Sequence, residues 1–299
     1  MDALNRLIVQ FVKLLPKPVV YVFAKKYIAG TRLDDAVRVV KELNAKGIVA
    51  TMDVLGESIS TKKEAEEAKK ECLDVLDAIN KHKLNANISV KPTQLGLVID
   101  PNFFYNQICE ILEKAKEYNN FVRIDMEDSS VTTSTIEMFN KVREKYSNVG
   151  IVVQAYLFRT FDDVVKLNKT GTNYRLCKGI YVEPAEIAYK GKQEVRDNYL
   201  KILDRMFEDG NYVGIATHDD ILLKDIYTRI KSKNIDKTKF EFQMLYGVTE
   251  HLRDKINKDG YKIRIYVPFG EHWYAYSIRR LQENPNMAWY ITKSIFSFR

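Results

Sequence analysis

The sequence predicts an α/β protein built as a (β/α)8 barrel, on three observations. Eight short runs rich in valine, isoleucine and other apolar residues recur between residues 47 and 267. Nearly all of them are separated by stretches with helical periodicity. Most end in a side chain that can ionise or form hydrogen bonds, and TIM-like barrels carry their active sites at the carboxyl ends of the strands. These eight side chains are Asp53, Lys91, Asp125, Gln154, Lys178, His218, Gln243 and Tyr266.

The predicted strands are short runs with little alternation between polar and apolar residues. Such runs suit strands of a parallel sheet, which are buried on both faces. The strands are expected at residues 47–53, 86–91, 121–126, 150–156, 174–179, 212–218, 240–245 and 262–269. Their count is the strongest support for a closed barrel.

Two of the intervening helices carry clear start signals. The first begins at Thr61, and Glu64 follows three residues later, which is the spacing of a capping box. The second begins at Asp100, followed by Pro101, a cap and a first-turn proline in the favoured order. After the fifth strand, a proline and a glycine interrupt the segment 182–193. We expect this segment to cross the barrel mouth before the outer helix begins.

The length and composition fit one barrel domain with an extension. The chain has 299 residues, 45% of them hydrophobic, which is enough for one large core. We expect a helical arm at residues 1–46 and the barrel at residues 47–299. The apolar runs of the arm are interrupted by lysines and prolines, so no membrane-spanning helix is predicted. The three cysteines lack CxxC spacing, which favours a reducing cytosol over a disulfide framework or a structural zinc site.

The net charge of +7 permits attraction to nucleic acid or to an anionic membrane. The lysines are scattered among glutamates, however, and no basic cluster interleaves with aromatic residues as nucleic-acid binding requires. We expect a solvated surface of mixed charge and no nucleic-acid partner. A basic binding protein without catalytic activity is an alternative that rests on charge alone.

The most specific group of polar residues follows the last strand. Tyr276, Arg279, Arg280 and Glu283 occupy successive turns of one predicted helix. Glu283 can therefore hold one arginine while the other guanidinium faces the barrel mouth. A planar guanidinium matches a carboxylate or a phosphate with two parallel hydrogen bonds. A ladder of surface ion pairs is the alternative interpretation.

Charged residues also end the second, third and fifth strands. Lys91 and Asp125 are expected side by side at the mouth, either as functional groups or as an ion pair that plugs the barrel. No histidine with ligand spacing accompanies Asp125, so a metal site is disfavoured. On the fifth strand, Arg175 or Lys178 could reach a cofactor while the other anchors a phosphate. Lys178 could instead form a Schiff base, which would make the protein a lyase or aldolase.

Seven segments of the chain carry motifs that occur together in one enzyme family. Two are the most specific, YRLCKGIY (174–181) and YVPFGEHWYAYSIRRLQEN (266–284). The supporting segments are SVKPTQLG (89–96), RIDMED (123–128), VVQAYL (152–157), ATHD (216–219) and FQMLYG (242–247). They resemble the proline dehydrogenase family, FAD-dependent barrel enzymes that oxidise L-proline, and follow the family order over residues 47–284. The first resembles the family's RLxKGxY motif of strand five, and the second its YxPxG…YxxRRLxEN ending.

The resemblance implies a set of residues that bind the substrate. Arg279 and Arg280 are expected to bind the proline carboxylate, with help from Lys91. Asp125 is expected to keep these cations ionised and oriented. The other residues implied, which wall the ring or orient the arginines, are Leu245, Tyr266, Tyr276 and Glu283.

The resemblance also implies FAD as the cofactor. Arg175, implied with Asp125 as a catalytic residue, is expected near flavin N5, where positive charge favours the reduced anionic ring and so hydride acceptance. The family binds FAD on a barrel, which explains why the chain has no GxGxxG motif. The remaining FAD contacts implied are Met126, Gln154, Lys178, Gly179, Ile180, Thr217 and His218. For His218, a neutral core histidine is the alternative.

The implied reaction transfers a hydride from C5 of L-proline to flavin N5 and gives Δ1-pyrroline-5-carboxylate, with the electrons passed on to a quinone. The resemblance is to the single-function type, so a separate pyrroline-5-carboxylate dehydrogenase is expected to perform the next step. Ile180 and Val182 stand where the family often has alanine and tryptophan, so the flavin packing is expected to differ there. We expect a cytoplasmic protein, with residues 7–24 as a candidate surface for peripheral contact with the inner face of the membrane.

Overall fold

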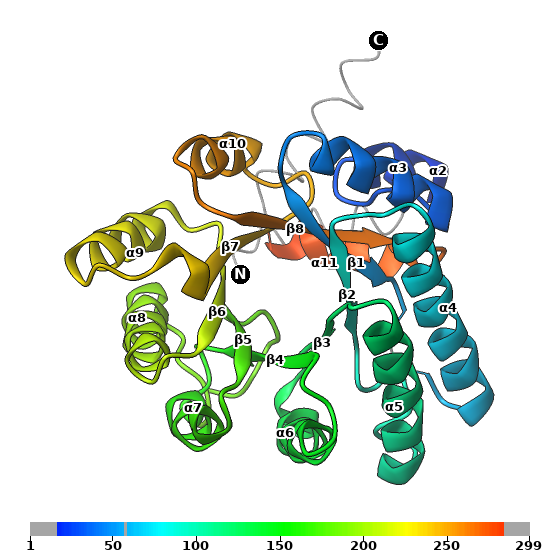
Figure 1. Ribbon diagram of the computed structural model, residues 1–299, viewed down its shortest axis with the longest axis horizontal. Coiled ribbons are helices and arrows are strands. Elements are labelled where there is room, and N and C mark those ends of the chain that lie inside the picture. Colours follow the sequence, from blue (N-terminus) through cyan, green and yellow to red (C-terminus); the bar gives the residue numbers. More distant parts are fainter. Residues whose placement is uncertain (1–16, 57–58, 284–299) are drawn as a thin grey trace.

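The computed structural model describes residues 17–56 and 59–283, except for the side chains of residues 19, 23 and 279–283. Within this part, eight parallel strands close into a barrel in the order of the sequence, and helices surround it (Figure 1). The predicted fold class is confirmed. The strands are β1 (Val49–Val54), β2 (Ala86–Val90), β3 (Val122–Ile124), β4 (Val149–Gln154), β5 (Asn173–Cys177), β6 (Tyr212–Ala216), β7 (Phe240–Leu245) and β8 (Ile263–Phe269).

Several strands end before the polar residue that was expected to close them. The third strand, predicted to reach Met126, ends at Ile124, although the amide of Asp125 still donates to the carbonyl of Val90. Lys91 likewise follows the end of β2. The polar side chains at the mouth are therefore carried by the first residues of the loops as well as by the strands.

The helices lie where the periodicity places them. Thr61 caps α4 in a capping box, with Glu64 accepting from the Thr61 amide at 2.9 Å. Asp100 accepts from two amides at the start of α5, and both predicted caps are confirmed. The described helices are α2 (Lys17–Ala24), α3 (Leu33–Asn44), α4 (Lys62–Lys81), α5 (Pro101–Glu117), α6 (Ser129–Arg143), α7 (Thr160–Leu167), α8 (Lys192–Glu208), α9 (Asp220–Ser232), α10 (Glu250–Lys258) and α11 (Trp273–Glu283), with 3-10 turns η1 (Asn168–Thr170) and η2 (Lys237–Lys239).

Two helices depart from a regular alternation of strand and helix. In a regular barrel, the helix after β8 would cover the outside of β8 and β1. Here α3, which precedes the barrel in the sequence, packs against both of these strands (Figure 1). The helix that follows β8, α11, packs against α2 instead, and the rings of Tyr21 and Trp273 meet edge to face at 4.9 Å. The division of the chain at residue 46 stays a prediction.

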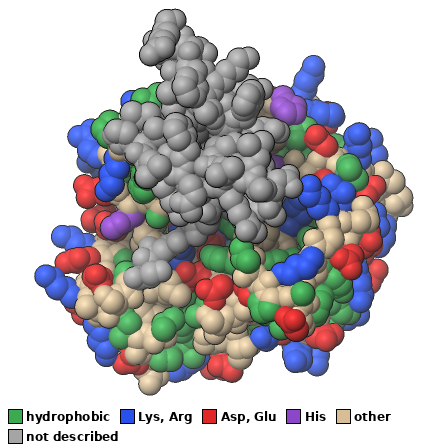
Figure 2. Space-filling view, turned by 180° about the vertical axis from the view of Figure 1, so that it is seen from behind, with side chains coloured by type: hydrophobic (Ala, Val, Ile, Leu, Met, Phe, Trp, Pro, Cys, Tyr) green, Lys and Arg blue, Asp and Glu red, His purple; other side chains and the backbone are tan. Residues whose placement is uncertain are grey.

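Polar side chains fill much of the barrel interior, where branched apolar residues are usual. Buried interior residues include Thr51, Asn87, Arg123, Glu241 and Gln243. The main apolar core lies between the strands and the surrounding helices. On the face shown in Figure 2, the described lysine and arginine side chains intermingle with aspartate and glutamate around the rim. Of the helices described, none combines the length and the hydropathy that a membrane crossing requires.

Candidate active site

The carboxyl ends of the strands enclose a cavity of about 530 Å3. All eight strands or the loops that follow them contribute to its lining, and α11 adds Tyr276. The cavity brings together every predicted site residue whose side chain is described, namely Lys91, Asp125, Met126, Gln154, Arg175, Lys178, Gly179, Ile180, Thr217, His218, Leu245, Tyr266 and Tyr276. Arg279, Arg280 and Glu283 belong to the same helix as Tyr276, but their side chains lie outside the described residues.

Arg175 is held in one orientation by hydrogen bonds to three other strands or their ends. Its Nε donates to Gln243 Oε1 at 2.6 Å, and its two terminal nitrogens donate to Asp125 Oδ1 at 2.7 Å and to Ser89 Oγ at 3.1 Å. The guanidinium also lies over the Tyr266 ring, 5.0 Å from its centroid. Arg175 therefore places a buried positive charge at the cavity wall, on a guanidinium group held in one orientation.

Asp125 joins Arg175 to the aromatic wall of the cavity. Its second oxygen accepts a hydrogen bond of 2.8 Å from the Tyr266 hydroxyl. Burial, and then the negative charge of Asp125, raise the pKa of the Tyr266 phenol well above its ordinary value. The hydroxyl therefore keeps its proton and acts as a donor, so the aspartate fixes the tyrosine ring as well as the arginine.

Lys91 forms its buried ion pair with Asp53, whereas Asp125 pairs with Arg175. The Lys91 Nζ and Asp53 Oδ1 atoms lie 2.6 Å apart. Burial and the nearby Asp125 raise the pKa of the Asp53 carboxyl, although Lys91 opposes this. The other oxygen of Asp53 has no hydrogen-bond partner among the described residues. Lys91 and Asp125 both line the mouth, but Lys91 forms this ion pair with Asp53 on β1, which flanks β2 on the side opposite to β3.

At the rim, Lys178 lies in a cluster of charges rather than in an apolar pocket. Its Nζ is 3.0 Å from Asp219, which also accepts two hydrogen bonds from Arg196, at 2.9 and 3.1 Å. Burial alone would raise the pKa of Asp219, but Arg196 and Lys178 outweigh it, and the pKa lies well below the ordinary value. With its side chain 39% exposed and paired with a carboxylate, Lys178 lacks the desolvated apolar surroundings in which a lysine commonly becomes a Schiff-base nucleophile.

His218 has a structural role that sequence reasoning left open. The backbone amide of Leu245 donates to its Nε2 at 3.0 Å, and its Nδ1 lies 2.7 Å from the Thr249 hydroxyl. An amide can only donate, so Nε2 is an acceptor and the ring is neutral with its proton on Nδ1. His218 therefore joins the end of β7, at Leu245, to Thr249 in the segment that follows, and it also lines the cavity.

The rest of the lining combines apolar walls with polar groups. Met126, Val152, Ile180 and Ala216 contribute apolar surface beside the amide of Gln154 and the hydroxyl of Thr217. Ile180 is 39% exposed, and Val182, which does not line the cavity, is 93% exposed. A flat ring system with polar edges fits such a surface and would cover part of the exposed apolar rim.

Gly179 lets the chain leave β5 close to a tyrosine. Its φ of +108° is one that side chains rarely adopt, and a Cβ would lie 2.1 Å from the Tyr156 ring. The backbone of residues 178–180 can therefore follow the cavity wall only because residue 179 has no side chain.

Some residues that line the cavity, or that hold Arg175 beside it, were not predicted as site residues. Asp53 and Gln243 were recognised only as strand ends, and Ser89 was not singled out. Ser89 lies two residues before Lys91, so the period of two along a strand was the signal that could have found it. Arg196 and Asp219 lie 23 residues apart, and no local pattern connects them.

Comparisons with known proteins point to one enzyme family. A family model described as proline dehydrogenase matches residues 36–291. The chain is 36% identical to proline dehydrogenase 1 of Bacillus subtilis (strain 168) over 91% of this chain and 90% of that protein. It is 38% identical to proline dehydrogenase 2 of the same strain, over 89% and 88%. A crystal structure of proline utilization A (PutA) from Bdellovibrio bacteriovorus, inactivated by N-propargylglycine, superposes with a TM-score of 0.82 at 30% identity. That match covers 88% of this chain and 33% of the larger one.

Proposed function

Because the chain belongs to the proline dehydrogenase family and is an oxidoreductase acting on proline, we propose that it oxidises L-proline to Δ1-pyrroline-5-carboxylate with FAD at the barrel mouth. The observation that supports this proposal most directly is the buried Arg175, held by three acceptors at the wall of a cavity of about 530 Å3. This reaction would be the first step of proline catabolism.

The residues at the mouth suit a flavin. When bound, FAD would supply an electrophilic N5 that accepts the hydride leaving C5 of proline. Arg175 offers fixed positive charge where negative charge increases during the transfer, and a preorganised charge of this kind needs no rearrangement at the moment of reaction. At the rim, Lys178 and Arg196 together carry one more positive charge than their shared partner Asp219, which suits the anionic pyrophosphate of the cofactor.

The remaining FAD contacts in our proposal are side chains that line the apolar and polar parts of the same cavity. Gln154 is held in place because its amide nitrogen donates to the carbonyl of Glu127 at 2.7 Å. The full set proposed is Met126, Gln154, Arg175, Lys178, Gly179, Ile180, Thr217 and His218.

The substrate is proposed to bind between this surface and α11. Tyr266, Tyr276 and Leu245 would enclose the ring, and Lys91 would contribute to binding the carboxylate. We assign the main carboxylate contacts to Arg279 and Arg280, because their helix already brings Tyr276 to the cavity and a guanidinium binds a carboxylate through two hydrogen bonds. Glu283 would orient these arginines, and Asp125 would act through Arg175 and Tyr266.

We also propose a quinone as the electron acceptor and a separate pyrroline-5-carboxylate dehydrogenase as the enzyme that uses the product. We propose a cytoplasmic protein, and a lipid-soluble quinone would require it to make a peripheral contact with the membrane. The segment predicted to make that contact, residues 7–24, lies partly outside the described residues.

An absorbance spectrum from 300 to 600 nm, recorded before and after anaerobic addition of L-proline, tests the proposal. We expect a flavin spectrum that bleaches with L-proline and not with the same concentration of D-proline. A flavin that stays oxidised would contradict the substrate. Purified protein with no flavin spectrum even after FAD is added would contradict the cofactor, and borohydride trapping of a substrate on Lys178 would then support the lyase alternative.

A further inference from the structure

A chain of hydrogen bonds runs from Arg175 through the barrel interior toward the opposite end. Arg175 Nε donates to Gln243 Oε1 at 2.6 Å, and Gln243 Nε2 donates to Glu241 Oε1 at 2.7 Å. Both oxygens of Glu241 accept from Arg264. Gln243 and Glu241 lie two residues apart on β7, so both point into the barrel. The contact of Arg175 with Gln243 is thus one link of a longer polar network.

Glu241 determines which way the Gln243 amide faces. Burial by itself raises the pKa of this carboxyl, but Arg264 and Lys262 outweigh it and bring the pKa to about 2. An ionised carboxylate only accepts hydrogen bonds, so Gln243 must turn its NH2 group toward Glu241. Its carbonyl oxygen is then directed at Arg175, where an acceptor is needed. A flipped amide would place a donor against the Arg175 donor and an acceptor against the Glu241 carboxylate.

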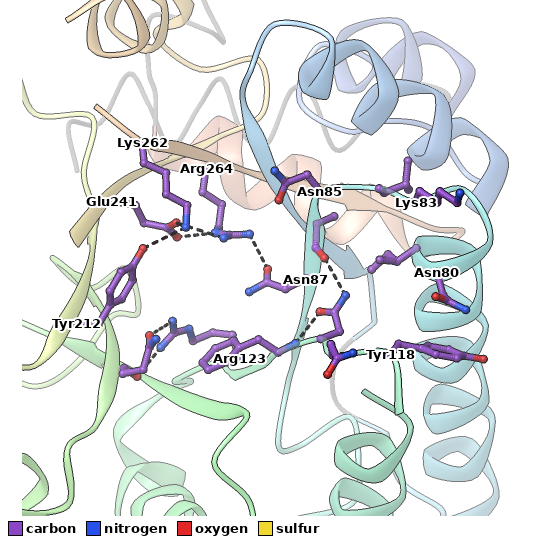
Figure 3. A pocket seen from close by; sticks show the side chains of 17 residues that line it. Asn80, Lys83, Asn85, Asn87, Tyr118, Arg123, Tyr212, Glu241, Lys262 and Arg264 are labelled. Atoms are coloured by element: carbon purple, nitrogen blue, oxygen red, sulfur yellow. Dashed lines mark hydrogen bonds and ion pairs between the residues drawn. The ribbon is translucent and has the colours of Figure 1, made fainter. Parts of the chain in front are cut away.

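The far end of the network is anchored at the amino-terminal end of the barrel. Arg264 also donates to the carbonyl of Ala50 at 2.6 Å and to Asn87 Oδ1 at 3.1 Å, and Lys262 lies 3.1 Å from Glu241. Figure 3 shows these side chains meeting at the wall of a cavity of about 600 Å3. Glu241 itself is only 2% exposed, so its position is set by contacts with protein groups rather than by solvent.

Neighbouring β6 leaves space for this arrangement. A Cβ added to Gly214 would lie 2.3 Å from Gln243 Nε2 and 2.7 Å from its Cδ. The φ angle of Gly214 lies outside the left-handed region, so its backbone does not require glycine. The residue is small because the Gln243 amide occupies the place of its side chain.

We propose that Gln243 and Glu241 are positioning residues that fix the direction of the Arg175 guanidinium and so the charge offered to the flavin. This inference rests on the proposed function. Neither residue touches the transferred hydride in this scheme. They act through Arg175, whereas the Asp125 contact alone would leave the Nε side of the guanidinium without an acceptor among the described residues.

Gln243→Met tests the inference because it keeps the size of the side chain and removes the acceptor. Losing a hydrogen bond to a charged group should lower kcat roughly tenfold to hundredfold, with little change in the KM for proline. The flavin midpoint potential should also become more negative, because a misdirected cation stabilises the reduced ring less. Gly214→Ala should act in the same direction, since its Cβ would displace the Gln243 amide.

Asn173→Leu is a matched control. It removes an acceptor from another interior arginine, Arg123, whose terminal nitrogen donates to Asn173 Oδ1 at 2.5 Å, and it leaves the Arg175 network intact. We expect its flavin potential and kcat to equal those of the parent protein. Thermal melting of all variants separates folding from positioning, and if Gly214→Ala fails to fold, Gln243→Met carries the test.

The inference and the proposed function fail in different ways. If the parent protein binds no flavin or is not bleached by L-proline, the proposed function is wrong, and the inference that rests on it is overturned with it. If the parent protein is bleached but Gln243→Met keeps its potential and kcat, the positioning role alone is wrong. Equal losses in Asn173→Leu and Gln243→Met would also overturn it, because they would indicate a general effect of loosening the barrel interior.

Discussion

The ion pair between Lys91 and Asp53 predicts a stability change that depends on pH. Its charged atoms lie 2.6 Å apart, and the two side chains are only 10% and 2% exposed. Lys91→Met keeps most of the apolar stem and removes the cation. Removing one partner of a buried pair costs about 3–5 kcal/mol of folding free energy, because the other charge is left uncompensated.

The sign of the pH dependence follows from Asp53. Burial raises the pKa of this carboxyl, Asp125 adds to the effect, and Lys91 opposes it. Without Lys91 the pKa rises further above that of the unfolded chain, so the folded protein holds a proton that the unfolded chain releases. A carboxyl whose pKa is higher in the folded protein stabilises the fold below its pKa in the unfolded chain, which is about 4 for aspartate. This contribution is lost as the pH rises through the pKa of the carboxyl in the folded protein. The penalty of Lys91→Met should therefore be larger at pH 8 than at pH 5.

Urea unfolding of the parent protein and the variants at both pH values measures this effect. Lys69→Met is the control, because Lys69 and Glu110 also lie 2.6 Å apart but at the surface, where such a pair contributes less than about 1 kcal/mol. Adding Asp53→Leu to Lys91→Met should restore most of the lost stability, since no charge then stays buried. Equal penalties at the two pH values, or a double variant less stable than Lys91→Met alone, would refute the reasoning.

Three further predictions concern single side chains. Replacing Arg279 or Arg280 by alanine should raise the KM for proline roughly tenfold to hundredfold with flavin still bound, because a bidentate carboxylate partner is lost; an unchanged KM in both variants contradicts their assignment. Tyr266→Phe should lower the free energy of unfolding by about 1–3 kcal/mol, since the Asp125 carboxylate loses a buried donor; urea unfolding with no measurable change would show that this bond does not stabilise the fold. Iodoacetamide at pH 8 should spare Cys177 in the native protein and modify it after unfolding, because burial raises the pKa of its thiol to about 12; peptide mass mapping that finds rapid native labelling would contradict this.

Local signals in the sequence were sufficient for the helix starts and the order of the elements. The capping box of Thr61 and Glu64 spans four residues, and the proline after Asp100 is its direct neighbour, so both could be recognised without knowledge of the fold. The number of strands and their parallel pairing followed from the repeated alternation of strand and helix. Each of these signals is carried by residues that are close in the sequence, although the strand pairing itself joins distant segments, such as β1 and β8.

The partners of the site residues could not be predicted in the same way. Arg175 finds its acceptors on β2, just after β3 and on β7, so their identity depends on how the strands are staggered around the barrel. Two strands, β1 and β3, flank β2, and Lys91 pairs with Asp53 on β1, which the sequence alone does not indicate. The replacement of the helix after β8 by α3 also depends on packing across the whole chain.

The place of α3 has a consequence for folding during synthesis. Its buried residues, among them Val37 and Val40, pack on a surface made by the first and the last strand of the barrel. Roughly 220 residues separate the end of α3 from the start of β8. At about 5–20 residues per second, the ribosome needs on the order of 10 to 40 s to add them. Throughout that interval β8 is missing, so the apolar face of α3 can pack only against β1. The pairing of β8 with β1 beneath α3 is therefore expected to be among the last steps in the folding of the nascent chain.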